Sequence, residues 1–317
     1  PLKINRCEKC CHIQLSVSVD PDLMFKDYLY VSGTSRTMLE YFDWFAKYTN
    51  EYYNMLFPDT YNLSVLDIGC NDGSQLDYYK QLGFCTQGID PAENLHVESS
   101  KKHDIVCGYF DKETAKKLNR PKIIVAQNVF AHNYNPLQFM EAIKDIMDDD
   151  SIFFIQTSQS DMILNNEFDT IYHEHISFYN IKSMNELCKR AGLNLIDVVK
   201  TTMHGYSYLF VVSKSINRQH NIDNLIAVEE KKGLYNPDTY KMYETLCLNV
   251  KNSFASTVDK FRSMGYDIIG YGAAAKGNTL LNFTGSKLDY IIDDNPLKHD
   301  YFAPGSQIKI VPISILD

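Results

Sequence analysis

The sequence has few of the features that mark a membrane-spanning, secreted or nucleic-acid-binding chain. No apolar run approaches the roughly 20 residues of a transmembrane helix, and the stretch after Pro1 lacks the basic and apolar regions of a signal peptide. Lys and Arg total 31 against 40 Asp and Glu, and the resulting net charge of -9 disfavours sequence-independent binding to a polyanion. We therefore expect a cytoplasmic protein without a membrane or nucleic-acid partner.

Cysteine is also sparse, with 8 residues among 317, and most of these lie in strand-like or helix-like segments. A disulfide framework is not expected in a chain of this size and spacing. With 44% hydrophobic and 22% charged residues, the chain can bury a large core and should form two or more cooperating domains.

Short apolar runs alternate with helical patterns through the middle of the chain. The expected strands are Val65–Gly69, Thr86–Asp90, Ile123–Gln127 and Ile152–Thr157, with helices at Gln75–Leu82, Leu137–Met147 and Glu186–Ala191. This alternation predicts an α/β fold with a parallel sheet. Further strands at Leu193–Lys200 and Tyr206–Ser213 are joined too closely for a parallel crossover. They predict an antiparallel hairpin at the sheet edge, which is typical of class I methyltransferases.

We expect three domains, at residues 1–57, 58–214 and 215–317. The first has a cysteine knuckle and an aromatic-rich helix over Met38–Leu56. The second is the α/β domain, and the third starts with a helical linker over Asn221–Met264. A second nucleotide-fold-like unit follows, with strand Asp267–Tyr271, loop Gly272–Asn278, helix Thr279–Phe283 and strand Tyr290–Ile292.

A glycine-containing turn follows the first strand of the α/β domain. In Asp67-Ile68-Gly69-Cys70-Asn71-Asp72-Gly73, small and short polar residues let backbone amides approach a ligand closely. The spacing differs from a dinucleotide fingerprint and resembles motif I of S-adenosylmethionine enzymes. Asp90, at the end of the next strand, is placed to accept hydrogen bonds from ribose hydroxyls. The other predicted cofactor contacts are Phe110, Gln127 and Asn128, although Gln127 could equally cap a helix.

Proton-transfer side chains crowd the segment Tyr172-His173-Glu174-His175. Histidine titrates near neutral pH, and a neighbouring carboxylate or phenol can orient it, so the pattern suits a general base. A structural histidine pair is the alternative. A metal site ranks below both, because no third ligand follows at a suitable spacing.

The small residues and lysine of the loop Gly272–Asn278 precede an expected helix. Backbone amides, the helix dipole and Lys276 would suit a phosphate or diphosphate. The loop is not a P-loop, since Lys276 precedes Gly277 and Asn278 replaces the hydroxyl ligand to magnesium. A close-packed turn is the alternative.

Cys7 and Cys10 form a C-x-x-C knuckle, which is half of a structural zinc site. Cys11 and His12 are poorly spaced to complete one tetrahedral ion. A second pair upstream of Pro1 is the better hypothesis, and with the missing initiator Met it indicates a truncated chain.

Taken together, the motifs resemble the sugar C-methyltransferase family, which methylates nucleotide-linked 4-keto-6-deoxysugars at C3. The resemblance covers most of the chain. It rests on the following stretches: Cys7 to Cys10 with Gln14-Leu15, Asp27 to Ser35, Asp67 to Gly73, Asn128 to His132, Phe168 to His175 and Gly270 to Thr279.

This resemblance implies an N-terminal domain with a four-cysteine zinc, a middle domain that binds S-adenosylmethionine, and a C-terminal unit that helps hold the nucleotide sugar. It implies His175 as the base, Tyr172 and Glu174 as its neighbours, and Tyr30 as a tyrosine from the N-terminal domain. The predicted substrate contacts are His132, His204, Ser207, Gly272, Lys276 and Asn278. By itself, His132 after an apolar stretch is more often structural.

One departure concerns His204-Gly205-Tyr206-Ser207, where the family usually has His-Gly-Gly-Ser followed by Arg. The loss of an arginine removes a possible phosphate partner, so the sugar or the acceptor atom could differ. The alternatives are therefore an O- or N-methyltransferase acting on a sugar, and a non-catalytic zinc-bearing scaffold. We expect a monomer or a homodimer.

Overall fold

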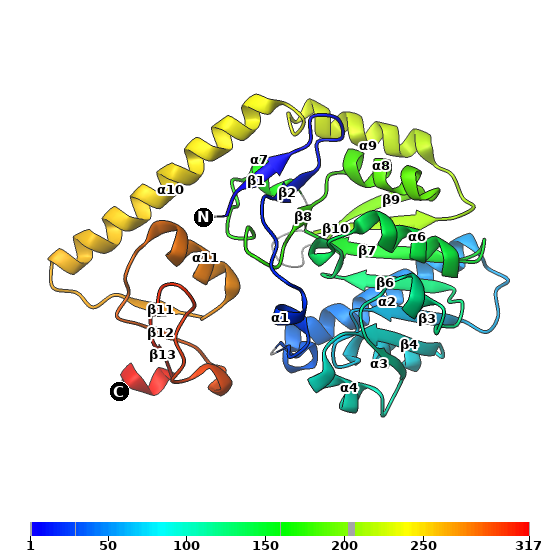
Figure 1. The fold of residues 1–317 in the computed structure, drawn as a ribbon, viewed down its shortest axis with the longest axis horizontal. Coiled ribbons are helices and arrows are strands. Elements are labelled where there is room, and N and C mark those ends of the chain that lie inside the picture. The colour runs from blue at the N-terminus through cyan, green and yellow to red at the C-terminus, as the bar shows by residue number, and fades with distance from the viewer. Residues whose placement is uncertain (1, 29, 159, 202–206, 317) are drawn as a thin grey trace. The chain divides into compact units, whose positions relative to one another are not determined.

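The computed structural model describes residues 2–28, 30–158, 160–201 and 207–316, which group into two units (Figure 1). The first unit comprises residues 3–160 and 173–231, and the second comprises residues 161–172 and those from 232 onward. Neither limit coincides with the boundaries expected at 57/58 and 214/215, and the three-domain division stays a prediction.

A seven-stranded sheet organises the first unit. Its strands are β3 Ser64–Ile68, β4 Cys85–Asp90, β5 Asp104–Cys107, β6 Ile123–Gln127, β7 Ile152–Thr157, β9 Asn194–Thr201 and β10 Ser207–Ser213. The order is β5-β4-β3-β6-β7-β10-β9. Strand β10 runs antiparallel to both β7 and β9, while the pairs among β3 to β7 are parallel. The α/β fold of a class I methyltransferase, with its inserted hairpin strand, is thereby confirmed.

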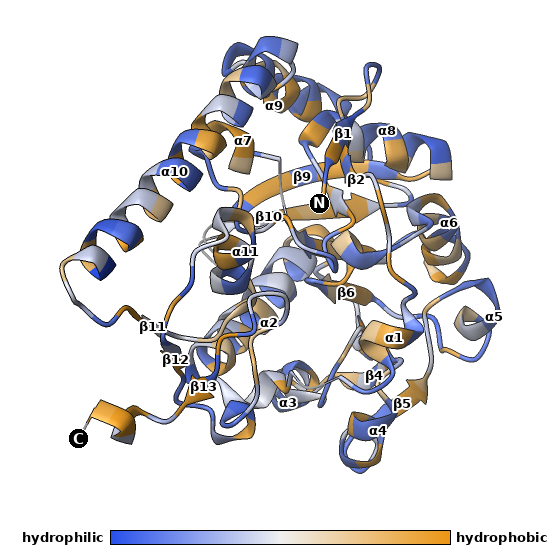
Figure 2. Cartoon of the chain, turned by 60° about the vertical axis from the view of Figure 1, so that its left-hand side comes forward, coloured by the Kyte–Doolittle hydropathy of each residue, from blue (hydrophilic) through white to orange (hydrophobic). Residues whose placement is uncertain are grey.

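Helices cover both faces of this sheet. Helices α2 (Arg36–Leu56) and α3 (Ser74–Gln81) pack on one face, against alternate residues such as Val65 and Phe154. Helices α5 (Lys112–Ala115), α6 (Pro136–Ile146), α8 (Ile181–Ala191) and α9 (Gln219–Lys231) cover the other face. Helix α4 (Glu93–Ser99) connects β4 to β5. Strands β9 and β10 are mostly hydrophobic in Figure 2, as expected for a sheet buried on both faces.

The N-terminal residues build a small second sheet in the same unit. Strands β1 (Ile4–Arg6) and β2 (Ile13–Leu15) form a hairpin, and β2 also pairs antiparallel with β8 (Ser177–Phe178). The chain then passes through α1 (Asp22–Phe25) and a 3-10 turn η1 (Ser32–Thr34) into α2. A second 3-10 turn, η2, spans Phe130–His132. Because β8 begins two residues after His175, the small sheet fixes the end of the predicted catalytic segment.

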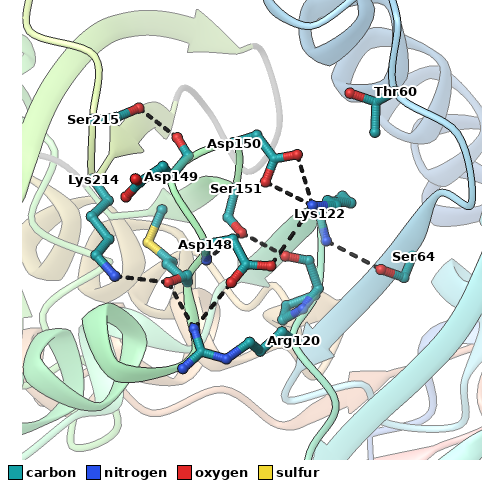
Figure 3. Close-up of polar contacts among 12 residues, drawn as sticks. Thr60, Ser64, Arg120, Lys122, Asp148, Asp149, Asp150, Ser151, Lys214 and Ser215 are labelled. Atoms are coloured by element: carbon teal, nitrogen blue, oxygen red, sulfur yellow. Dashed lines mark hydrogen bonds and ion pairs between the residues drawn. The ribbon is translucent and has the colours of Figure 1, made fainter.

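Charged contacts hold the amino ends of the central strands. Lys122, just before β6, lies 2.7 Å from both carboxylate oxygens of Asp150, just before β7 (Figure 3). Arg120 contacts Asp148 at 3.1 Å in the same cluster. The ligands of open α/β sheets bind at the opposite, carboxyl edge. This cluster therefore stabilises the fold away from the expected site.

The second unit contains a three-stranded parallel sheet of β11 (Ile269–Tyr271), β12 (Tyr290–Ile292) and β13 (Ile310–Val311). Its helices are α7 (Met162–Asn165), α10 (Pro237–Ser263) and α11 (Ala275–Thr284), with 3-10 turns η4 (Pro296–Lys298) and η5 (Ile313–Leu316). The hydroxyl of Tyr243 on α10 donates a 2.8 Å hydrogen bond to the carbonyl of Glu167. This contact ties the segment after α7 to the long helix.

Two helices begin earlier than the sequence pattern predicted. Helix α11 starts at Ala275 rather than Thr279, so Lys276 and Asn278 belong to its first turn and not to the preceding loop. Helix α8 starts at Ile181 instead of Glu186. The side chain of Asn180 caps this start by accepting a hydrogen bond from the Ser183 amide.

In the described parts of the chain, no helix is long and apolar enough to cross a membrane.

Candidate active site

The turn from β3 into α3 requires glycine at two positions. Gly69 has a φ of 73°, and a Cβ there would overlap the side chain of Val129. Gly73, the N-cap residue of α3, has a φ of 82°. Because left-handed φ values and crowding exclude most side chains, glycine is required at both positions of this turn. We call residues 69–73 the donor loop.

Asp90 lies beside the donor loop, at the carboxyl end of β4. One of its carboxylate oxygens accepts a 2.8 Å hydrogen bond from the amide of Asn71, and the other accepts one of 2.8 Å from the amide of Ala92. Burial raises the pKa of Asp90, although both amides favour the charged form. Each oxygen keeps acceptor capacity, so the carboxylate suits vicinal hydroxyls.

Asp67 is buried within β3, on the face covered by α2 and α3. Its burial, and then the nearby charges of Asp90 and Asp72, raise its pKa well above the usual range. The carboxyl groups of Asp67, Asp72 and Asp90 therefore lie close together at the donor loop, and this environment disfavours the charged form of Asp67.

The side chains of Asn71 and Asp72 hold the N-terminal segment. Asn71 accepts a 2.9 Å hydrogen bond from the amide of Ser32 and donates one of 3.0 Å to the carbonyl of Tyr30. Asp72 accepts a 3.0 Å hydrogen bond from the amide of Gly33. We call residues 28 and 30–33 the strap. The sequence predicted cofactor contacts for Asn71 and Asp72, whereas in the structure their side chains bind the strap.

The other predicted cofactor residues lie at the carboxyl ends of neighbouring strands. Phe110, after β5, packs on Phe139 with ring centroids 4.9 Å apart. The side-chain nitrogen of Gln127 donates a 2.8 Å hydrogen bond to Gln75, while its buried oxygen has no hydrogen-bond partner among the described residues. Asn128 has a φ of 57°, which ends β6 in a turn. Gln127 thus offers a free acceptor at the ligand-binding edge.

His175 lies within a cluster of titratable side chains. Its Nδ1 is 3.1 Å from Oγ of Ser158, which follows β7. The ring of His132 is 5.2 Å away from that of His175, centroid to centroid. Oε2 of Glu174 is 3.9 Å from Nδ1 of His132. Contact of Nδ1 with the hydroxyl orients the imidazole, and with the proton on Nδ1 the basic nitrogen would be Nε2.

Tyr28 joins this cluster from the strap. Its hydroxyl donates a 3.3 Å hydrogen bond to Oε2 of Glu174. The sequence predicts a role for Tyr30 and not for Tyr28, because no local spacing signals a contact between residues 146 positions apart. Tyr30 is 45% exposed, and burial of the rest of its side chain, with the charge of Asp72, raises its pKa.

The surroundings shift two pKa values in this cluster. Burial raises the pKa of Glu174, and the hydrogen bond from Tyr28 opposes that effect. Burial also lowers the pKa of His132 to about 4. His132 is therefore neutral near pH 7, so its contact with Glu174 is not an ion pair.

Backbone contacts fix the position of the catalytic segment. The amide of Ile176 donates a 2.8 Å hydrogen bond to the carbonyl of Ala131, and the amide of Leu15 donates one of 2.8 Å to the carbonyl of Ile176. His173 is exposed. Tyr172 belongs to the second unit, and its predicted role beside His175 stays a prediction.

The remaining predicted substrate contacts are divided among several parts of the chain. Ser207 is buried at the start of β10, opposite Thr201, and His204 lies outside the described residues. In the second unit, Gly272 has a φ of 91°, with open space where a Cβ would stand. Lys276 Nζ is 3.9 Å from Asp169, and Asn278 accepts a hydrogen bond from Asn282.

The cysteine knuckle brings two thiols together between β1 and β2. Backbone and side-chain hydrogen bonds from Cys10 lower the pKa of the exposed Cys7 thiol, whereas burial raises the pKa of Cys10. In the part of the chain that the structure describes, no cluster of three or more metal-ligating side chains occurs. The zinc site stays a prediction.

Comparison with known proteins agrees with this arrangement. Residues 40–198 match the family model of a methyltransferase domain, and residues 202–317 match that of a C-methyltransferase C-terminal domain. The chain belongs to a C-methyltransferase family. As a member, it is an S-adenosylmethionine-dependent methyltransferase. It is similar to the C-methyltransferase NovU of Streptomyces niveus, with 25% identity over 98% of this chain and 76% of NovU.

Solved methyltransferase structures are similar to parts of this chain. The plantazolicin methyltransferase BpumL is 18% identical, with a TM-score of 0.43 over 53% of this chain and 82% of its own. Magnesium protoporphyrin IX methyltransferase from Synechocystis PCC 6803 is 12% identical, with a TM-score of 0.42 over 55% of this chain and 79% of its own.

Proposed function

We propose that the protein transfers a methyl group to C3 of a nucleotide-linked 4-keto-6-deoxysugar. The observation that carries this proposal is the position of His175, whose Nδ1 contacts Ser158 within a cluster that includes Glu174, His132 and Tyr28. A C–H bond needs a positioned base, whereas a hydroxyl or amine acceptor needs less assistance. The similarity to a C-methyltransferase supports the same acceptor type.

The donor loop and Asp90 fit S-adenosylmethionine. Gly69 and Gly73 permit the left-handed turn after β3, Asp90 would accept from the ribose hydroxyls, and the free oxygen of Gln127 suits a further donor group. When bound, S-adenosylmethionine supplies an electrophilic methyl group.

Deprotonation of the substrate explains the residues of the cluster. The C4 ketone acidifies the C3 hydrogen, which Nε2 of His175 removes while the electron pair moves into the enolate. Tyr30 and Tyr172 would donate hydrogen bonds to the enolate oxygen. The C3 carbon then forms its new bond with the methyl carbon, whose bond to sulfur breaks. Ser158 keeps the base oriented throughout.

The second unit would bind the nucleotide portion. Amides at the start of α11 and the ammonium group of Lys276 suit a diphosphate, and the glycine at position 272 admits close approach. Lys276 lies 3.9 Å from Asp169, so a phosphate would compete with that carboxylate. In the N-terminal part, Cys7 and Cys10 would contribute half of a structural zinc site.

Hydrogen exchange tests this function. Incubation of a 4-keto-6-deoxysugar nucleotide with the protein in D2O should place deuterium at C3, and addition of the methyl donor should replace that deuterium with a methyl group. Both activities should be lost in His175→Ala and retained in His173→Ala, because His173 is exposed. Methylation at oxygen or nitrogen without exchange would establish the alternative acceptor. Full exchange and methylation in His175→Ala would refute the assigned base.

A further inference from the structure

The strap is bonded to two separate segments of the central α/β unit. Besides its contacts with Asn71 and Asp72, it meets the start of α4, where the side chain of Asn94 contacts the main chain of Tyr28 twice. Oδ1 of Asn94 accepts a 3.1 Å hydrogen bond from the Tyr28 amide, and Nδ2 donates one of 3.0 Å to the Tyr28 carbonyl. The amide of Glu93 also donates a 3.0 Å hydrogen bond to the carbonyl of Lys26.

We propose that Asn94 is a positioning residue for methyl transfer: it fixes the main chain of Tyr28 and thereby holds the Tyr28 hydroxyl against Glu174. This inference rests on the proposed function, because it assigns Asn94 a role in the acid-base cluster that removes the substrate proton.

The paired contact requires an amide side chain. A carboxamide offers one donor and one acceptor on adjacent atoms, which match the amide and carbonyl of a single residue. An aspartate at position 94 would place an oxygen opposite the Tyr28 carbonyl and lose one of the two hydrogen bonds. Because both polar groups of Tyr28 are fixed, the direction of its Cα–Cβ bond is fixed as well.

Ring contacts connect Tyr28 with the side chains around Glu174. The ring lies 5.8 Å from that of Phe25 and 6.4 Å from that of Tyr30, both in edge-on geometry. Phe25 in turn contacts His132, with ring centroids 5.4 Å apart. Release of the strap at Asn94 would thus disturb the side chains that surround Glu174.

Asn94 leaves the hydrogen bonds of the donor site untouched. Asp90 bonds to the amides of Asn71 and Ala92, and neither bond involves the side chain of Asn94. Substitution of Asn94 should therefore slow proton removal without weakening donor binding. Substitution of a residue that only stabilises the fold would impair both proton removal and donor binding.

The test compares Asn94→Ala and Asn94→Asp with Tyr28→Phe and with the double variant Asn94→Ala/Tyr28→Phe. We expect Asn94→Ala to slow deuterium exchange at C3 about tenfold, because the Tyr28 hydroxyl would no longer be held in its hydrogen bond to Glu174. Exchange should then begin at higher pH, because Glu174 loses its donor, while the affinity for S-adenosylmethionine stays within about twofold. In the Asn94→Ala background, the further substitution Tyr28→Phe should reduce the rate of deuterium exchange only slightly. Asn54→Ala, on the exposed side of α2, is the control for loss of a surface amide.

Additive effects of the two substitutions, or an unchanged pH profile, would overturn the role of Asn94. A second readout, independent of turnover, is the carboxyl 13C NMR titration of Glu174, which should move to higher pH in both Asn94 variants. If the unaltered protein catalyses no exchange, the proposed function fails while this titration still decides the role of Asn94. Asn94→Asp keeps one hydrogen bond and provides a folded variant should Asn94→Ala be unstable.

Discussion

The amide of Gly33 donates a 3.0 Å hydrogen bond to Oδ2 of Asp72, although 39 residues separate the two. Asp72 lies in the donor loop, so the same loop that suits the methyl donor also binds the strap. A Cβ at position 33 would collide with Asp72 Oδ2 and Ser74 Oγ. The close approach explains why glycine occupies this position.

Gly33→Ala should therefore push the strap away from the donor loop. Overpacking of this kind typically costs about 1–3 kcal/mol. We expect a lower melting temperature and weaker binding of S-adenosylmethionine, measured by thermal unfolding and calorimetry. Ser32→Ala is the matched control, because it keeps the main-chain amide that bonds to Asn71. Equal behaviour of the two variants would contradict a tight contact at Gly33.

Ser158→Ala should slow proton removal without preventing it. The variant loses the 3.1 Å contact with Nδ1 of His175, so the imidazole samples unproductive orientations. Loss of one orienting hydrogen bond predicts roughly a tenfold fall in deuterium exchange, well short of the effect of His175→Ala. Ser158→Thr retains the hydroxyl and should restore most of the rate. An exchange rate unaffected by Ser158→Ala would show that the hydroxyl does not orient the base.

Asp90→Asn should weaken donor binding. The amide side chain has one acceptor oxygen, so it cannot bond to the amides of Asn71 and Ala92 and also accept from two hydroxyls. Hydrogen bonds to charged groups contribute about 1.5–3 kcal/mol, which predicts a rise in Kd of about 10- to 150-fold. Calorimetric titration with S-adenosylhomocysteine measures it. Asp77→Asn is the control, since Asp77 pairs with Lys102 on the protein surface, 2.8 Å away. An unchanged Kd in Asp90→Asn would show that Asp90 does not bind the methyl donor.

His132 should make the stability of the protein depend on pH. Its pKa is about 4 in the folded chain, against about 6.5 in an unfolded one. As pH falls from about 6.5 to about 4, the unfolded state binds the proton first, so the free energy of unfolding decreases. The full effect is on the order of 3 kcal/mol for this largely buried side chain.

His132→Asn removes the titration of this side chain. Buried carboxyl groups with raised pKa values increase stability as pH falls, so the wild type must be compared with His132→Asn to isolate the contribution of His132. The stability advantage of the wild type over His132→Asn should shrink toward pH 4 in denaturant unfolding. A difference that is constant from pH 7 to pH 4 would contradict a buried, neutral His132.

The regular parts of the fold were predictable from the sequence because their signals are local. Strands β6 and β12 have the expected bounds, Ile123–Gln127 and Tyr290–Ile292, since each is a short apolar run between polar residues. The start of α11 was placed too late, because Gly277 and Asn278 look like loop residues. In the structure Gly277 lies within the helix, where even a Cβ would meet only an ordinary contact with the Gly272 carbonyl.

The candidate site was predictable only in part. The donor loop and Asp90 follow from the strand-turn-helix pattern, and the crowding of side chains marks His175 and Glu174. The contacts of Tyr28 and Asn94, and the use of Asn71 and Asp72 to hold the strap, join segments from 39 to 146 residues apart. No periodicity or spacing encodes such contacts, because they arise from tertiary packing.

The pairing of β2 with β8 also bears on the order of folding. His12 and Ser177, whose side chains are 3.2 Å apart, are separated by 165 residues. Closure of so long a loop is entropically costly and comes after local contacts have formed. During synthesis, the N-terminal hairpin can pair with β8 only after residues 177 and 178 have left the ribosome. We therefore expect the contacts around His175 to form late in folding, so that a collapsed intermediate would contain the central sheet before this cluster is complete.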